Sequence, residues 1–172
     1  MIPGLIVAAI VLTFGFVVAF GAPYVPSHRR EVRRSFKELY SVGKRDVVVD
    51  LGAGDGRVLR EASRCGAAAY GVELNPLLVL FARLRLAGGA GARVTLGDMW
   101  RYRLPDDTTL VYAFSVSRDS ARLARHLQAE AERLRRPLHV MMYGSTLTGP
   151  RPVRTWRGHT LYRLAPLQGK KA

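Results

Sequence analysis

Three acidic residues follow three successive apolar segments, and their spacing points to a single binding site. Asp50 lies in the run Val-Val-Val-Asp-Leu, Glu73 ends the run Tyr-Gly-Val-Glu, and Asp98 follows a third short apolar segment. If these segments are neighbouring parallel strands, their carboxyl ends meet at one edge of a sheet, where open α/β sheets bind ligands. The sequence therefore predicts an acidic ligand site at that edge.

A glycine-rich turn directly follows the first of these segments. Gly52, Gly54 and Gly56 alternate with Ala53 and Asp55. Gly52 and Gly54 let the backbone turn tightly and approach a ligand, and Gly56 opens a helix whose first amide groups are free to bind it. The spacing is G-x-G-x-G and not the G-x-G-x-x-G of dinucleotide sites. A carboxylate inside the loop would repel a diphosphate, so Asp55 is expected to suit a ligand with positive charge.

The positions of the acids favour S-adenosylmethionine, which carries a sulfonium and an ammonium group. Asp50 is suited to the ammonium, and Glu73 lies about 20 positions after the first glycine, where an acid binds both ribose hydroxyls. Asp98 follows the third strand, where an adenine amino group would lie, and Met99 and Trp100 would pack on the ring. The predicted cofactor-binding residues are Asp50, Gly52, Ala53, Gly54, Gly56, Glu73, Leu74, Asn75, Asp98, Met99 and Trp100.

Alternating apolar and amphipathic segments predict the elements that position this site. The expected strands are 47–51, 69–74, 93–96, 110–114, 138–143, 153–156 and 160–164. The expected helices are 57–64, 76–86 and one with Leu123, Leu127, Ala131 and Leu134 on one face. Strands that alternate with helices indicate an α/β fold with a mostly parallel, Rossmann-like sheet, closed here by two antiparallel last strands. This domain is expected over residues 46–165, followed by a basic tail at 166–172.

The amino-terminal segment predicts a membrane anchor. The first 25 residues carry no charged side chain, and about 20 apolar residues span a bilayer core. Basic residues follow the apolar run from Arg29 to Arg45, so the positive-inside rule places the amino terminus outside and the globular part in the cytoplasm. A cleaved signal peptide would instead need a basic region before the run. We therefore expect a single-pass transmembrane helix at 1–23.

A basic amphipathic helix is expected within residues 24–45, with Ser27 as its N-cap and Gly43 at its end. Val32, Phe36, Leu39 and Tyr40 recur at helical spacing, with basic residues between them. This helix would pack on the domain, lie on anionic lipid headgroups, or do both.

The composition excludes cysteine-based cross-links and metal clusters but does not identify the partner of the basic surface. The 172 residues carry a formal net charge of +14, almost all of it from arginine. Such a charge suits nucleic acid, anionic lipid or an acidic partner, and it also fits a merely solvated surface. Cys65 is the only cysteine, which excludes an intrachain disulfide and a cysteine-based zinc cluster.

Four motifs resemble those of the class I S-adenosylmethionine-dependent methyltransferases, and among them the small seven-strand protein-lysine methyltransferases. That group includes the archaeal broad-specificity enzymes and the mitochondrial ATP synthase c-subunit and adenine nucleotide translocase lysine methyltransferases, which carry an amino-terminal membrane segment. The resemblance runs from Pro23 to about Leu164 and is dense up to Trp100. Ala53 stands where those proteins usually have Ser or Cys. The motifs are APYVPS (22–27), VVDLGAGDGRV (48–58), GVELNP (71–76) and GDMW (97–100).

The resemblance implies methylation of lysine side chains in a protein substrate, a membrane protein among the candidates. It also implies that Tyr24, Val25 and Pro26 close over the cofactor beside the acceptor, although the same residues fit a simple elbow at the membrane exit. Ser115 ends a central strand on the ligand side, so Tyr24 and Ser115 are the candidate catalytic residues. Tyr112 and Tyr143 also end central strands, and core packing accounts for them better than substrate contact.

Other acceptors and a non-catalytic role are alternatives to lysine methylation. The basic surface would serve RNA, and the anchor would serve an aminophospholipid. A third interpretation is a membrane-tethered binding module that kept the fold. The complete set of acids disfavours the third, and the lack of an added recognition domain disfavours RNA. The acceptor, the degree of methylation and the oligomeric state do not follow from the sequence.

Overall fold

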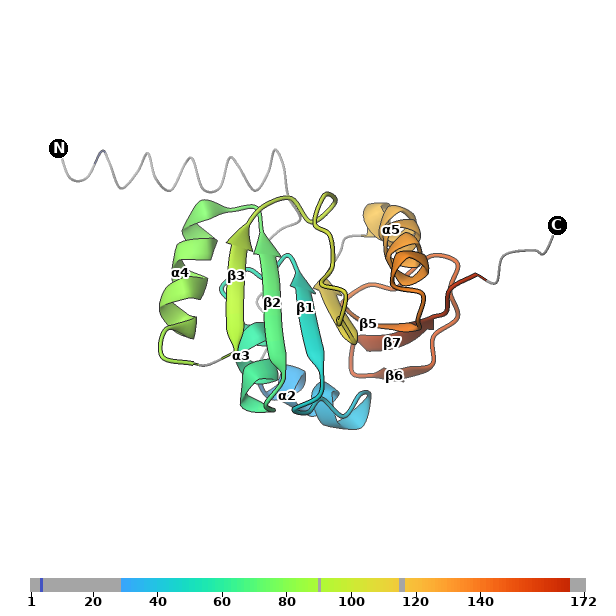
Figure 1. Cartoon of the computed structure of the whole chain (residues 1–172), viewed down its shortest axis with the longest axis horizontal. Coiled ribbons are helices and arrows are strands. Elements are labelled where there is room, and N and C mark those ends of the chain that lie inside the picture. The colour runs from blue at the N-terminus through green and yellow to red at the C-terminus, as the bar shows by residue number, and fades with distance from the viewer. Residues whose placement is uncertain (1–3, 5–28, 90, 115–116, 168–172) are drawn as a thin grey trace.

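The computed structural model describes residues 4, 29–89, 91–114 and 117–167 of the 172-residue chain (Figure 1). The strands are β1 (Val47–Leu51), β2 (Ala68–Glu73), β3 (Ala92–Leu96), β4 (Leu110–Phe114), β5 (Leu138–Tyr143), β6 (Arg154–Trp156) and β7 (His159–Leu164). The helices are α2 (Arg29–Glu38), α3 (Arg57–Arg64), α4 (Pro76–Leu86) and α5 (Ser120–Leu134), with a 3-10 turn η1 (Ser117–Asp119) before α5.

The seven strands of the described residues form one sheet in the order β3-β2-β1-β4-β5-β7-β6. The first five strands of the chain pair in parallel, while β7 lies antiparallel between β5 and β6. The predicted Rossmann-like sheet with antiparallel last strands is therefore confirmed. All predicted strand bounds agree with the structure within one residue. One difference bears on the site, because β2 ends at Glu73 and leaves Leu74 outside the sheet.

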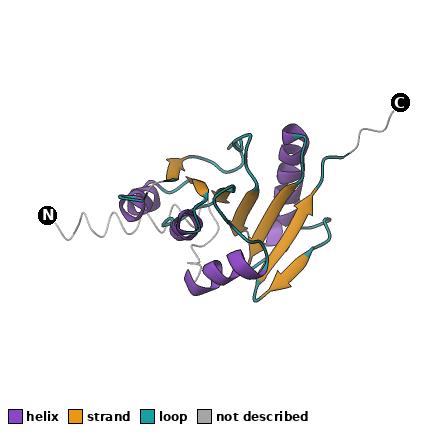
Figure 2. Cartoon of the chain, turned by 60° about the horizontal axis from the view of Figure 1, so that its bottom comes forward, coloured by secondary structure: helices purple, strands orange, loops and turns teal. Residues whose placement is uncertain are grey.

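Helices cover both faces of the sheet (Figure 2). Successive strand residues point to opposite faces. Val48 in β1 packs into the core formed with α2, α3 and α4, while its neighbour Val49 packs into the core formed with α5. Tyr112 and Val111 divide in the same way in β4. Because both faces of the central strands are buried, their sequences are almost continuously apolar.

Helix α2 packs on the domain, as one of the predicted alternatives required. Val32 and Phe36 are fully buried beside the sheet, and Leu39 is buried just after the helix. The Tyr40 hydroxyl donates to Asp46 Oδ1 at 2.8 Å and joins the segment after α2 to the start of β1. The helix ends at Glu38, before the predicted end at Gly43, because residues 39–46 form a turn that enters the sheet.

The predicted transmembrane helix at 1–23 and the predicted cap at Ser27 lie outside the described residues, apart from Gly4. Within the described part of the chain, no helix has both the length and the apolar character that a bilayer crossing requires. The boundaries proposed at 23, 45 and 165 stay predictions.

A loop of irregular backbone, residues 97–109, joins β3 to β4 and covers part of the α5 face of the sheet. Leu104 in this loop is buried in that core, and Met99, Trp100 and Tyr102 pack against it. The Leu104 amide donates to Glu130 Oε2 of α5 at 2.9 Å. The loop is therefore held by α5 at a fixed position beside the carboxyl ends of β2 and β3.

We expect Gly71→Ala to destabilise the domain by about 1–3 kcal/mol, because overpacking a well-filled core costs that much. Gly71 lies in the middle of β2, and an added Cβ would come within 2.7 Å of both the Ala53 and the Leu59 side chains. Gly43→Ala is the matched control, since a Cβ there meets nothing within 4 Å. Urea unfolding checks the difference, and equal midpoints for the two variants would contradict it.

Candidate functional site

The predicted ligand edge is built on the carboxyl ends of β1, β2 and β3. Asp50 in β1 pairs in register with Gly71 of β2, and Glu73 of β2 pairs with Leu96 of β3. The amides of Gly52 and Ala53 donate to the Val72 carbonyl at 2.9 and 3.0 Å, so the glycine turn is hydrogen-bonded to the end of β2. The fold thus brings the predicted acids and the predicted turn to one edge.

The glycine turn has a backbone that explains its sequence. Gly52, Gly54 and Gly56 all have positive φ angles, 87°, 54° and 77°, which side chains with a Cβ rarely adopt. Gly56 precedes α3 and has no side chain to cap it, so the first amides of that helix keep their donors. An added Cβ on Gly56 would also lie 3.1 Å from the Ala82 Cβ of α4. The alternate glycines therefore satisfy a turn and a close helix contact together.

The carboxylate of Glu73 holds two backbone segments. Its Oε2 accepts from the Gly54 amide at 2.9 Å, and its Oε1 accepts from the Asn75 amide at 2.8 Å. Each carboxylate oxygen can accept more than one hydrogen bond, so both oxygens keep capacity for a ligand hydroxyl. Glu73 therefore combines a structural role in the turn with the geometry of a ligand acceptor.

Asn75, predicted as a cofactor contact, is buried and has a clear local task. Its Oδ1 accepts from the Leu77 amide at 2.9 Å and from the Leu78 amide at 3.4 Å, which makes it the N-cap of α4. Pro76 follows at the first helical position, where the missing N–H is not needed. The neighbouring Leu74 is exposed beside this cap.

Asp50 is the most unusual acid of the site. Its side chain is 3% exposed, and within the described part of the chain its carboxylate makes no hydrogen bond or ion pair. Burial raises the pKa of Asp50 well above the ordinary carboxyl value, and the nearby carboxylates of Glu73 and Asp55 raise it further. The charged form of Asp50 therefore needs a cation beside it, which is the property expected of an ammonium-binding residue.

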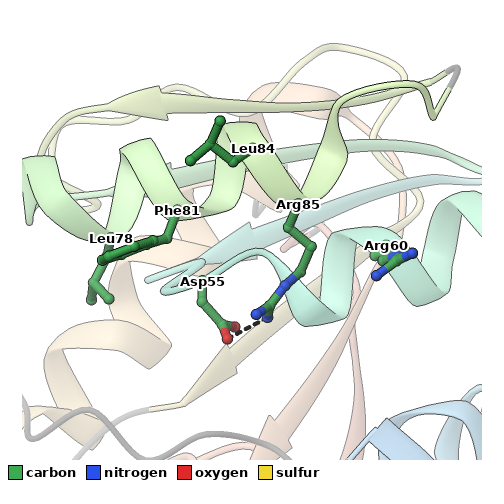
Figure 3. A pocket seen from close by; sticks show the side chains of 6 residues that line it. All are labelled: Asp55, Arg60, Leu78, Phe81, Leu84 and Arg85. Carbon is green, nitrogen blue, oxygen red and sulfur yellow. Dashed lines mark hydrogen bonds and ion pairs between the residues drawn. The ribbon is translucent and has the colours of Figure 1, made fainter.

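Asp55 differs from its prediction. The sequence predicts that its carboxylate meets a cationic ligand, but two arginines of the chain hold it instead. Arg57 Nε lies 2.8 Å from Asp55 Oδ2, and Arg85 of α4 pairs with the same oxygen (Figure 3). The partner Arg85 lies 30 residues further along the chain, so local spacing does not reveal the pair. Asp55 ties the glycine turn to the end of α4.

Asp98 is brought to the site by β3. The Gly97 amide donates to the Glu73 carbonyl at 2.9 Å, which places Asp98 directly after the β2–β3 pair. Asp98 Oδ1 accepts from the Trp100 amide at 2.9 Å. The Trp100 ring carries the guanidinium of Arg122 at 4.0 Å from its centroid, a cation–π contact that fixes the ring against α5. Met99 and Trp100 are half-buried in this loop.

A second group of side chains lies at the ends of β4, β5 and β7. Tyr112 and His159 are buried, and the Tyr112 hydroxyl lies 3.0 Å from His159 Nε2. The Tyr143 ring packs on His159 with centroids 4.6 Å apart and on Phe114 with centroids 6.3 Å apart. The Tyr143 hydroxyl donates to Glu31 Oε2 of α2 at 3.4 Å. This aromatic cluster includes Tyr112 of β4, which pairs in register with Asp50 of β1.

His159 and Glu31 are members of the site that sequence reasoning missed. Burial lowers the pKa of His159, so its ring is neutral near pH 7, and burial and Glu31 raise the pKa of Tyr143. The antiparallel register of β5 and β7 places His159 opposite Tyr143, and only the pairing of strands distant in sequence reveals this. The candidate catalytic residues Tyr24 and Ser115 lie outside the described residues. Their roles stay predictions.

Comparison with known proteins shows which family the chain is similar to. The chain matches the family described as the ANTKMT methyltransferase domain over residues 50–137, about half of its length. A lysine N-methyltransferase of Rattus norvegicus, named for the c-subunit of ATP synthase, is 32% identical over 143 residues, which cover 77% of this chain and 65% of the rat protein. A protein-lysine N-methyltransferase of Saccharolobus islandicus (strain REY15A) is 31% identical, with 63% of this chain and 69% of that protein covered.

A solved structure agrees with the fold. The RNA methyltransferase from Salinibacter ruber in complex with S-adenosyl-L-homocysteine is 29% identical, with a TM-score of 0.72 over 86% of this chain and 98% of that one. The chain spans less than two thirds of the length of the rat relative. The resemblance drawn from the four motifs is confirmed: the chain has the class I methyltransferase fold and belongs to the family of the ANTKMT methyltransferase domain.

Proposed function

We propose that this chain transfers a methyl group from S-adenosylmethionine to the side-chain amine of a protein lysine. The observation that carries the proposal is the buried Asp50, unpartnered within the described residues, beside Glu73 and the glycine turn in a chain of this family. A buried carboxylate without a partner is costly unless a cation neutralises it. The donor carries such a cation in its ammonium group, so the residues present fit it.

Each acid has a separate task in holding the donor. Asp50 would accept from the ammonium of the amino-acid part, and Glu73 would accept from the two ribose hydroxyls. Asp98 would accept from the adenine amino group, with Met99 and Trp100 against the ring. The relative positions of the three tasks follow from the order β1, β2, β3 across the sheet. The Salinibacter structure, a class I relative with S-adenosyl-L-homocysteine bound, supports this choice of ligand.

The acceptor side requires positioning more than strong acid–base chemistry. Once bound, the donor supplies an electrophilic methyl group on a sulfonium; the new N–C bond forms as the C–S bond breaks, and the sulfur keeps that electron pair. The chain must align the amine, exclude water and let the amine lose its proton. Phe114 ends β4, which pairs with β1, and Tyr143 ends β5 on the far side of β4, so their rings lie where they can hold a lysine side chain. Aromatic faces attract ammonium groups and also tolerate the neutral amine.

Lysine is favoured over RNA by the relatives that are more than 30% identical to this chain. The rat and archaeal proteins are named as lysine N-methyltransferases, and the archaeal match covers more than two thirds of that protein. The Salinibacter protein is titled an RNA methyltransferase, which makes RNA the second candidate. Both candidates share the donor site and differ only in the acceptor, so the product distinguishes them.

Membrane anchoring is part of the proposal. The uncharged apolar run at the amino terminus and the basic residues that follow it support a single-pass anchor with the domain in the cytoplasm. A tether to the membrane raises the effective concentration of membrane-protein substrates without requiring tight recognition. The rat relative is named for such a target, the c-subunit of the ATP synthase.

Asp50→Asn is expected to stabilise the fold while weakening the donor site. Folding raises the pKa of Asp50, so the fold favours the protonated, neutral carboxyl group. The stability that this neutral group contributes is fully present below the ordinary carboxyl pKa and is lost as the pH rises through the folded pKa. Asparagine stays neutral at every pH, so the melting temperature of the variant should exceed that of the parent at pH 8. The two should converge at about pH 4, the ordinary carboxyl pKa. Affinity for S-adenosylhomocysteine should fall about tenfold or more, since a hydrogen bond to a charged group contributes about 1.5–3 kcal/mol.

Thermal unfolding and calorimetry on the full chain in detergent micelles check both effects, with the exposed Asp107→Asn as the control. A lower melting temperature at pH 8 together with unchanged affinity would contradict the assignment of Asp50.

Glu73→Ala should weaken S-adenosylhomocysteine binding by roughly 2–4 kcal/mol, because two charge-assisted hydrogen bonds to ribose are lost and water replaces them in part. The same change frees the amides of Gly54 and Asn75, so some stability is lost as well. Affinity for free methionine, which has no ribose, separates the two effects. A ribose role predicts a much smaller loss for methionine, whereas equal losses would mean that Glu73 only shapes the turn.

The acceptor is tested with radiolabelled donor, the purified full chain and solubilised membranes. Label should appear as methyllysine in hydrolysed protein, and not in the separated lipid or RNA fractions.

Deletion of residues 1–22 should keep activity on a soluble lysine peptide and reduce the modification of membrane proteins. If label were found only in RNA, the lysine proposal would be wrong and RNA would be the methyl acceptor. Release of the full chain from membranes by alkaline carbonate would contradict the anchor.

A further inference from the structure

Helix α4 presents an apolar face away from the protein core. Leu77, Leu80, Phe81 and Leu84 are 39%, 52%, 57% and 66% exposed. Their spacing of three and four residues places them on one side of the helix. Val79, Ala82 and Leu86 are buried on the opposite side, against the sheet. The helix is therefore apolar on both sides, whereas a surface helix of a soluble domain normally carries polar residues on its outer side.

The apolar face of α4 continues toward the donor edge. Leu74, directly after β2, and Leu96, the last residue of β3, are also exposed. Six of the eight exposed large apolar side chains in the described part of the chain lie on α4 or at these two strand ends. A concentration of this kind marks an interaction surface, because single exposed apolar residues are normally scattered.

Arginines border this apolar face. At 100° per residue, Arg83 and Arg85 lie on opposite borders of the exposed stripe. Between α3 and α4 a cavity of about 490 Å³ joins the apolar face to one further cationic group, Arg60 of α3 (Figure 3). It is lined by Leu78, Phe81, Leu84, Asp55, Arg60 and Arg85. Arg60 of α3 has no ion-pair partner among the described residues, whereas Arg85 is held by Asp55.

We propose that this face of α4 docks on the surface of an anionic lipid bilayer, with the leucines and Phe81 in the acyl boundary and the arginines at the lipid phosphates. An apolar face bordered by basic residues is typical of helices that lie at the surface of a lipid bilayer. The formal net charge of +14 favours an anionic surface and disfavours a second copy of the chain as the partner. The uncharged run of the first 25 residues, which has the composition of a membrane segment, points to the same partner.

The proposal goes beyond a tether and does not depend on the identity of the acceptor. A tether alone leaves the domain free to rotate above the membrane, whereas contact through α4 defines which side faces the lipid. The patch runs from α4 to Leu74 and Leu96, beside Glu73. Docking would thus hold the β2–β3 edge of the donor site near the lipid headgroups.

The test uses the full chain with its single cysteine replaced, Cys65→Ala, and one new cysteine that carries an environment-sensitive fluorophore. Leu84→Cys reports on the α4 face, and Val153→Cys is the matched control because Val153 is 55% exposed and lies before β6. The labelled chains are reconstituted into phosphatidylcholine–phosphatidylglycerol vesicles that contain lipids with a doxyl quencher. The probe at position 84 should be quenched severalfold more than the probe at position 153. Equal quenching, or none, would overturn the proposal.

Two further experiments test the role of lipid charge and test whether protein, and not lipid, covers α4. Replacing phosphatidylglycerol by phosphatidylcholine should reduce quenching at position 84, and Arg60→Gln with Arg83→Gln should remove most of that dependence. A probe that is shielded but not quenched would mean that protein covers α4. Energy transfer between two labelled chains would then identify a second copy, and its absence would identify the amino-terminal segment of the same chain. Either result would overturn lipid docking.

Discussion

The carboxylate of Glu73 is the interaction on which the site geometry depends. It joins the amide of Gly54 in the turn after β1 to the amide of Asn75 at the start of α4. Both segments follow strand ends, where the regular hydrogen bonds of the sheet stop and the backbone needs other partners. The Glu73 side chain therefore supplies the hydrogen-bond acceptors that the sheet no longer provides to these two amides. It does so from the position where an acid is also expected to bind ribose. The turn is pre-shaped by the same group that would bind the ligand, so little reorganisation accompanies binding.

The site keeps three carboxylates close together, and the chain treats them differently. Asp55 is neutralised by Arg57 and Arg85, and Glu73 is held by backbone amides, but Asp50 is buried without a partner in the described part of the chain. Full neutralisation of all three would give a more stable domain with no preference for a cation. The unpartnered acid lowers stability and creates the electrostatic preference, which is a common relation between strain and function at binding sites.

Much of this arrangement is predictable because it is local. Val-Val-Val before a glycine-rich turn defines β1, Asn-Pro defines the start of α4, and the alternation of elements defines the parallel sheet. What escapes prediction is contact between distant residues: Asp55 with Arg85, Tyr112 with His159, and Tyr143 with Glu31. A one-residue difference in the end of β2 decides that Leu74 faces outward, and such boundaries depend on tertiary packing more than on local composition.

Helix α4 connects the donor site to the proposed lipid surface because both of its ends are fixed by site residues. Asn75 caps its first turn beside Glu73, and Arg85 in its last turn is held by Asp55 of the glycine turn. The buried side, Val79, Ala82 and Leu86, locks the rotation of the helix against the sheet. With both ends and the rotation fixed, the outer leucines have no freedom to turn inward when the domain is in water. Their exposure is therefore a consequence of how the site is built, and a surface that covers them is favoured by the same contacts that shape the turn.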